Sequence, residues 1–265
     1  MVMRAFLRGL AAVPLLQPIT HWVYRARTRD HVYNRRHPID ERLGIDTGGL
    51  IPGFLLGEGG NFRPTGYGGC VPSTVRTALG TLTDLDRASF IDLGCGKGRA
   101  MAVALEFPFR AIIGLEMNAS LVATALANAA IVRRSHPNSP EWRVLRADAT
   151  APEAPEGDIV YFLANPFGRG PMEQLLAHIQ KQMAPGRRIF VVYENPVQGL
   201  VFDNDPGFSR WYAAHLPYDA DEIGFGPDET ESVVIWAAGT ATPSPHKTSG
   251  VIAVKDEVMR AEVEG

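Results

Sequence analysis

The sequence predicts an α/β protein whose core is a doubly wound, mostly parallel β-sheet with helices on both faces. From residue 89 onward, apolar runs of strand length alternate with segments of helical periodicity. The first of these strands also ends in a glycine-rich turn, residues 94–98, that runs directly into a predicted helix. A strand, a glycine loop and a helix in this order build nucleotide pockets at the carboxyl end of a parallel sheet.

The core strands are short apolar runs bounded by turn residues. We predict them over residues 89–93, 110–115, 142–145, 158–163, 188–193 and 232–237. An aromatic segment around Phe208, Trp211 and Tyr212 lies before the last of these and receives no assignment.

The core helices carry recognisable start signals and apolar faces. Helices are predicted over residues 75–85 and 99–106, after Asn118, and over 171–183. Asn118 suits an N-cap, and Pro171 suits the first turn of its helix. Ser73 suits the N-cap of the helix over residues 75–85, and the loop that contains it, residues 67–74, is also a candidate to close over a cofactor. The helix after Asn118 repeats apolar residues on one face, namely Leu121, Val122, Ala125, Leu126 and Ala129. The helix over 171–183 does so at Met172, Leu175, Leu176, Ile179 and Met183.

Length, charge and cysteine content limit the function classes. The 265 residues suit one large domain, and the net charge of −3 argues against a general nucleic-acid-binding surface. Cys70 and Cys95 are the only cysteines, and a disulfide at Cys95 would obstruct the glycine loop, which favours a reducing, cytoplasmic compartment. The seven histidines are scattered, so no metal site is predicted.

The ends of the chain differ from its centre. We divide it into an N-terminal extension, residues 1–60, a core domain, residues 61–240, and a loose tail, residues 241–265. Residues 1–36 hold seven arginines against one aspartate, beside an apolar stretch that is too short to span a bilayer. Two interpretations stay open for this segment: a lid packed on the domain, or a peripheral contact with an anionic membrane surface.

The spacing around the glycine loop separates two cofactor classes. A dinucleotide fingerprint requires a small third residue, but Arg99 stands at that position. The spacing Asp92-x-Gly94-x-Gly96-x-Gly98 instead resembles motif I of the class I S-adenosylmethionine (SAM) methyltransferases. The resemblance extends over residues 40–240, through the runs DERLGIDTGG, FIDLGCGKGRA, EFPFRAIIGLE and FLANPFG, to a bacterial group of unassigned substrate.

This resemblance implies a seven-stranded Rossmann-like sheet and a SAM site along its carboxyl edge. Glu116 lies 20 residues after Gly96, where an acid accepts hydrogen bonds from ribose hydroxyls, and Asp148 has the place where related enzymes hold the adenine amino group. A solvated strand-end glutamate and a turn aspartate are the structural alternatives for these two acids. The implied cofactor-binding residues are Asp92, Gly94, Cys95, Gly96, Gly98, Glu116, Met117, Asp148, Ala149 and Asn165.

The run Asn165-Pro166-Phe167-Gly168 resembles the Asn-Pro-Pro-Tyr/Phe motif of amino-group methyltransferases, with one proline missing. Carried over, Asn165 orients the methyl acceptor and Phe167 lines its site. A strand-ending turn with a packed phenylalanine explains the same residues. The sequence thus predicts a SAM-dependent methyltransferase of unidentified acceptor, with an amine favoured. A non-catalytic binding protein on the same scaffold and, less favoured, an NAD-dependent oxidoreductase are the alternatives.

Overall fold

The computed structural model describes residues 19, 20, 23, 26, 31–56, 66–164, 166–226, 228–238, 252 and 254. Most of residues 1–36 and of the predicted tail, residues 241–265, lie outside the described residues, so the predicted lid or membrane role of the N-terminal segment and the domain boundaries stay predictions. Within the described ranges, each helix is too short or too polar to span a lipid bilayer.

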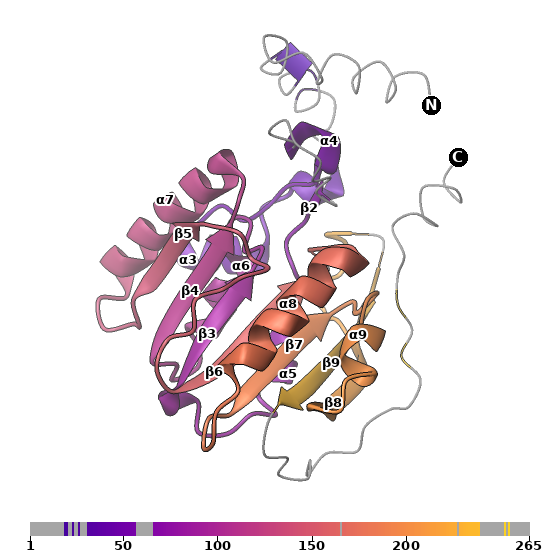
Figure 1. The fold of residues 1–265 in the computed structure, drawn as a ribbon. Coiled ribbons are helices and arrows are strands. Elements are labelled where there is room, and N and C mark those ends of the chain that lie inside the picture. The colour runs from indigo at the N-terminus through magenta and orange to yellow at the C-terminus, as the bar shows by residue number, and fades with distance from the viewer. Residues whose placement is uncertain are drawn as a thin grey trace.

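A seven-stranded, mostly parallel sheet forms the centre of the molecule, as predicted (Figure 1). Its order is β5-β4-β3-β6-β7-β9-β8; the first five strands in this order are parallel, and β9 runs antiparallel to both of its neighbours. The chain reverses its direction of sheet growth between β3 and β6, which is where open α/β sheets bind ligands. The strands are β3 (Ala88–Leu93), β4 (Ala111–Glu116), β5 (Trp142–Arg146), β6 (Asp158–Ala164), β7 (Ile189–Glu194), β8 (Phe208–Pro217) and β9 (Thr230–Ala238).

Two hydrophobic clusters bury the two sides of these strands. Successive side chains of a strand point to opposite faces, and Phe90 belongs to one cluster whereas Ile91 belongs to the other. Helices α5 (Pro72–Leu79) and α6 (Arg99–Ala104) contribute to the first cluster, and α8 (Arg169–Gln182) and α9 (Leu200–Asp203) to the second. Figure 1 shows α8 and α9 in front of the sheet and α5 and α6 behind it.

Helix α7 (Ala119–Ser135) corrects one prediction. Asn118 is its N-cap as predicted, since its side chain accepts hydrogen bonds from the amides of Ser120 and Leu121. The predicted apolar face is wrong at Leu126, which is 49% exposed, whereas Asn128 is buried. The polar side chain of Asn128 can occupy this buried position because its amide group hydrogen-bonds to the backbone of Asp46 and Lys97.

The helix predicted over residues 75–85 begins earlier and ends earlier, as α5. Pro72 occupies its first position, so Val71 is the N-cap, and the prediction that Ser73 caps this helix is wrong. The carboxylate of Glu222, 149 residues away, accepts from the Ser73 amide instead, at 3.1 and 3.2 Å. Leu85 lies in a separate 3-10 turn, η3 (Leu85–Arg87).

Short elements precede the core. They are η2 (Val32–Asn34), α3 (Pro38–Leu43), β1 (Ile51–Pro52), α4 (Gly53–Leu56) and β2 (Gly66–Tyr67), with β1 and β2 paired antiparallel. Figure 1 shows two of them, α4 and β2, at the carboxyl ends of β3 and β4. At the other end of the chain, the unassigned aromatic segment proves to be strand β8.

Candidate functional site

A cavity of about 450 Å³ opens at the carboxyl ends of β3, β4, β5 and β6, on the edge where the sequence predicts the ligand. Strands and the loops that follow them supply most of its walls. The predicted site residues that line it are Asp92, Gly94, Cys95, Gly96, Glu116, Met117, Asp148, Ala149 and Phe167.

Asp92 is the most deeply placed charged group of the cavity. It lies next to last in β3 and is 3% exposed. Among the described residues, no donor is within hydrogen-bonding distance of its carboxylate. Burial, and then the charge of Glu116, raise the pKa of Asp92 well above its ordinary range. Since a buried carboxylate is costly without a partner, this group is suited to receive a cationic donor from a ligand in the cavity.

Glu116 ends β4 and holds the glycine loop. Its Oε2 accepts from the amide of Gly96 at 3.0 Å, and its Oε1 accepts from the amide of Asn118 at 2.8 Å. Glu116 also lines the cavity, so its carboxylate lies where a ligand would meet it. The structure therefore adds a loop-holding role to the predicted one.

The amides of the glycine loop are already bonded within the protein. Those of Gly94 and Cys95 both donate to the carbonyl of Leu115 at 2.9 Å. The Gly98 amide donates to the Cys95 carbonyl at 2.7 Å, and the Gly96 amide donates to Glu116. Phosphate sites use such amides as free donors. This loop offers none of these four to an anion.

Residues after β5 line the far side of the cavity. Asp148 Oδ1 accepts from the amide and the hydroxyl of Thr150, both at 2.8 Å, which is the geometry of a turn aspartate. Its second carboxylate oxygen has no donor among the described residues. Arg146 lines the same side but donates from Nε to the Met117 carbonyl at 3.0 Å, so part of its guanidinium is engaged. Ala149, which is 4% exposed, adds an apolar surface.

The end of β6 forms the side that the sequence assigns to the acceptor. Ala164, Pro166 and Phe167 line the cavity, and Phe167 is 7% exposed. Pro166 lies against the glycine loop, because a Cβ on Gly94 would come within 3.0 Å of its Cβ. Asn165 lies outside the described residues, so its predicted role stays a prediction.

Gly98 is the one described member of the predicted cofactor set that does not line the cavity. It precedes α6 with a φ of +90°, which a side chain rarely adopts. A Cβ at this position would also collide with the indole of Trp142 on β5. Its role in the structure is therefore the close packing of the loop against the sheet.

One wall of the cavity is predicted only in part from the sequence. Leu56 and residues 66–70, which we call the N-terminal wall, line the cavity opposite the strands. The loop over residues 67–74 was expected near a cofactor, and its first four residues do line the cavity. Leu56 was not expected because it lies within the predicted extension. In the sequence, the glycines before Cys70 are the signal that indicates this wall.

Neither protein-family models nor curated proteins yield a match for this chain. Among solved structures, the chain is similar to a putative methyltransferase from Escherichia coli, with 18% identity, a TM-score of 0.47, and 72% of this chain and 100% of the other covered. A putative RNA methyltransferase from Pyrococcus horikoshii shows 15% identity and a TM-score of 0.45, with 63% and 82% covered. A magnesium protoporphyrin IX methyltransferase from Synechocystis with bound SAM shows 13% identity and a TM-score of 0.45, with 63% and 78% covered.

Proposed function

We propose that this protein is a SAM-dependent methyltransferase. The observation that carries the proposal is the buried Asp92 carboxylate, which faces the cavity with no donor among the described residues. SAM carries an α-ammonium group that provides the missing donors and charge. Hydrogen bonds to charged groups are among the strongest that a protein makes, so this pairing would orient the amino-acid part of the cofactor beside the glycine loop.

The charge of the cavity fits SAM better than a dinucleotide. Three acids line it, Asp92, Glu116 and Asp148, and both lining arginines already donate to backbone carbonyls. A dinucleotide would bring a pyrophosphate to a loop whose amides are engaged and whose neighbours are carboxylates. SAM carries a sulfonium and an ammonium against one carboxylate, so its net positive charge suits this acidic lining. This disfavours the NAD-dependent alternative.

The remaining acids fit the rest of the cofactor. Glu116 ends β4 at the cavity, where we assign its carboxylate to the ribose hydroxyls, and Asp148 has a carboxylate oxygen left for the adenine amino group. Met117 and Ala149 provide apolar surface beside them. In this arrangement the cofactor extends along the carboxyl ends of β3, β4 and β5.

SAM supplies an activated methyl group, so the protein has to align an acceptor with it and exclude water. We assign these tasks to the end of β6. Phe167 would pack against the acceptor, and Asn165 would accept hydrogen bonds from it. An amine, on a protein lysine or a small molecule, is the favoured acceptor because an Asn carbonyl accepts from an N–H. No side chain has to act as a strong base if the amine arrives neutral.

Calorimetry of the native protein with SAM, its demethylated product S-adenosylhomocysteine and NADH tests the proposal. We expect binding of the first two and none of NADH. Incubation of an extract with methyl-labelled SAM then separates an enzyme from a non-catalytic binding protein, and the fraction that takes up label identifies protein, lipid, nucleic acid or small molecule as acceptor. The absence of SAM and S-adenosylhomocysteine binding would contradict the proposal.

Replacing Asn165 by alanine is expected to lower turnover at least about tenfold while changing SAM affinity less than about twofold, because a group that acts on the acceptor contributes mainly in the transition state. Single-turnover rates and calorimetry on the same preparation measure the two quantities. Phe167→Leu is the matched variant: it keeps an apolar side chain and should raise the KM of the acceptor more than it lowers kcat. If SAM binding is lost in the Asn165 variant, that residue belongs to the cofactor site.

A further inference from the structure

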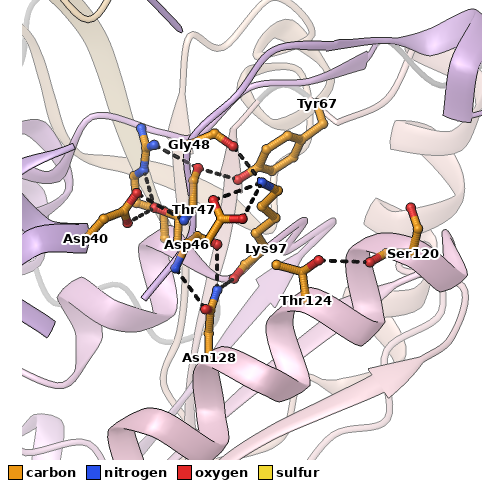
Figure 2. Close-up of polar contacts among 10 residues, drawn as sticks. Asp40, Asp46, Thr47, Gly48, Tyr67, Lys97, Ser120, Thr124 and Asn128 are labelled. Carbon is orange, nitrogen blue, oxygen red and sulfur yellow. Dashed lines mark hydrogen bonds and ion pairs between the residues drawn. The ribbon is translucent and has the colours of Figure 1, made fainter. Parts of the chain in front are cut away.

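Thr47 is a fully buried residue outside the cavity that connects two parts of its surroundings. Its amide and hydroxyl donate to the two carboxylate oxygens of Asp40, at 3.1 and 2.5 Å. The same hydroxyl accepts from Arg99 Nε at 2.8 Å. Its carbonyl accepts from Arg99 Nη2 at 2.8 Å and from the Tyr67 hydroxyl at 2.7 Å. Every polar group of Thr47 is therefore engaged, as Figure 2 shows.

Tyr67 connects the hydrogen bonds of Thr47 to the cavity. Its ring lies directly against the glycine loop, where a Cβ on Gly96 would collide with it. The ring also packs with Leu56 and Leu121, and all three side chains line the cavity. The hydroxyl, held by Thr47, fixes the tilt of the ring over Gly96. Tyr67 is thus the part of the N-terminal wall that covers the glycine loop.

A second set of bonds holds the residues on both sides of Thr47 (Figure 2). Lys97 Nζ donates to the Asp46 carboxylate at 3.1 and 3.2 Å and to the Gly48 carbonyl at 2.7 Å, and it lies 5.8 Å from the centroid of the Tyr67 ring. The Asn128 side chain accepts from the Asp46 amide and donates to its carbonyl, at 2.9 and 2.8 Å. These bonds fix the position of the segment that carries Thr47.

Arg99 connects the helix after the glycine loop to Thr47 and Cys70. It opens α6 directly after the glycine loop. Besides its two bonds to Thr47, its Nη1 donates to the Cys70 carbonyl at 3.3 Å, and its guanidinium lies where a Cβ on Gly69 would be. All three guanidinium nitrogens therefore donate to the segment that precedes α5. One side chain thus joins the start of α6 to Cys70 in the N-terminal wall and, through Thr47, to Tyr67.

We propose that Arg99 is a positioning residue for the cofactor: it fixes Thr47, Thr47 fixes Tyr67, and the ring then covers the glycine loop and the ligand beside it. This inference rests on the proposed function. It explains why an arginine can stand where a dinucleotide fold needs a small residue. The guanidinium bonds to Thr47 and Cys70, whereas the close contact between the loop and Trp142 of β5 is made at Gly98.

The test is a double-mutant cycle on SAM affinity, with Arg99→Met, Tyr67→Phe and the double variant measured by calorimetry. Tyr67→Phe keeps the ring and removes only the bond to Thr47. We expect Arg99→Met to weaken binding about tenfold and Tyr67→Phe about threefold. The double variant should be within about twofold of Arg99→Met, because both side chains act through Thr47 and their effects are then not additive.

Arg188→Met is the matched control, since Arg188 donates to the buried Asp158 at the amino end of the sheet, away from the cavity. It should lower the thermal midpoint and leave SAM affinity unchanged. If the SAM affinity of the double variant falls by the product of the two single-variant factors, Arg99 contacts the ligand directly. That result would overturn this inference alone. Unchanged affinity in both single variants would do the same. Native protein that binds neither SAM nor S-adenosylhomocysteine would overturn the proposed function first.

Discussion

Replacing Asp92 by asparagine is expected to weaken SAM binding roughly 10- to 100-fold and, at the same time, to raise the thermal midpoint of the unliganded protein. Hydrogen bonds to a charged group contribute about 1.5–3 kcal/mol, and asparagine offers the cofactor ammonium an acceptor without the charge. The unliganded protein gains because it no longer buries a carboxylate for which the described residues provide no donor. Groups that bind a ligand commonly lower the stability of the unliganded protein.

The gain in stability should depend on pH in a defined direction. In the unfolded chain an aspartate ionises at about pH 4, whereas burial and the charge of Glu116 raise the pKa of Asp92 in the folded protein. Between these two values the folded protein keeps a proton that the unfolded chain has lost, so its stability falls as pH rises. Asparagine does not titrate, so the advantage of the variant should grow from about pH 4 upward.

Asp158 provides the matched control. It is 5% exposed, at the amino end of β6 in the same sheet, and it accepts from the amide and Nε of Arg188 at 2.9 and 2.8 Å. Asp158→Asn should lower the thermal midpoint and leave SAM affinity unchanged. Thermal unfolding between pH 4 and 8, with calorimetry at pH 7.5, measures both variants. An Asp92 variant that binds SAM like the native protein, or that is less stable at neutral pH, would remove Asp92 from the cofactor site.

The positions of the three acids in the candidate site follow from local pattern. Asp92, Glu116 and Asp148 each follow a short apolar run, and parallel strands bring their carboxyl ends to one edge of a sheet. The structure places all three acids around one cavity. The strand positions and their parallel direction are sufficient to predict that the three acids lie around one cavity.

The incorrect predictions concern residues whose partners lie far away in the chain. Asn128 was passed over for Leu126 because periodicity alone favours an apolar residue on a buried face. Its partner Asp46 lies 82 residues earlier, and no local pattern indicates that bond. Ser73 is similar, since the carboxylate that accepts from its amide belongs to Glu222. Long-range polar contacts of this kind are decided by tertiary structure, which a single sequence does not reveal.

At Arg99, local sequence pattern and long-range contacts both matter. The sequence showed that it departs from a dinucleotide fingerprint, and this favoured the other cofactor class. What the side chain does instead depends on Thr47 and Cys70, which lie 52 and 29 residues earlier in the chain. The predicted extension, residues 1–60, therefore contributes through Thr47 to the surroundings of the cavity.

Replacing Glu116 by alanine is expected to weaken SAM binding by about 1–3 kcal/mol, through two effects that can be separated. The carboxylate holds the amides of Gly96 and Asn118, so its removal leaves the glycine loop less well fixed. It is also assigned to the ribose hydroxyls. Glu116→Gln should not restore affinity, because its side-chain NH2 would face one of these two amide donors.

A deoxy ligand isolates the ribose contact. Native protein should bind S-adenosylhomocysteine several-fold more tightly than its 2′-deoxy analogue, and Glu116→Ala should bind the two almost equally, because the hydroxyl then has lost its acceptor. Glu222→Ala is the control: that carboxylate also accepts from a buried backbone amide but does not line the cavity, so the variant should be less stable and still discriminate the two ligands. If Glu116→Ala keeps the full preference for the 2′-hydroxyl, Glu116 acts only on the loop and another group holds the ribose.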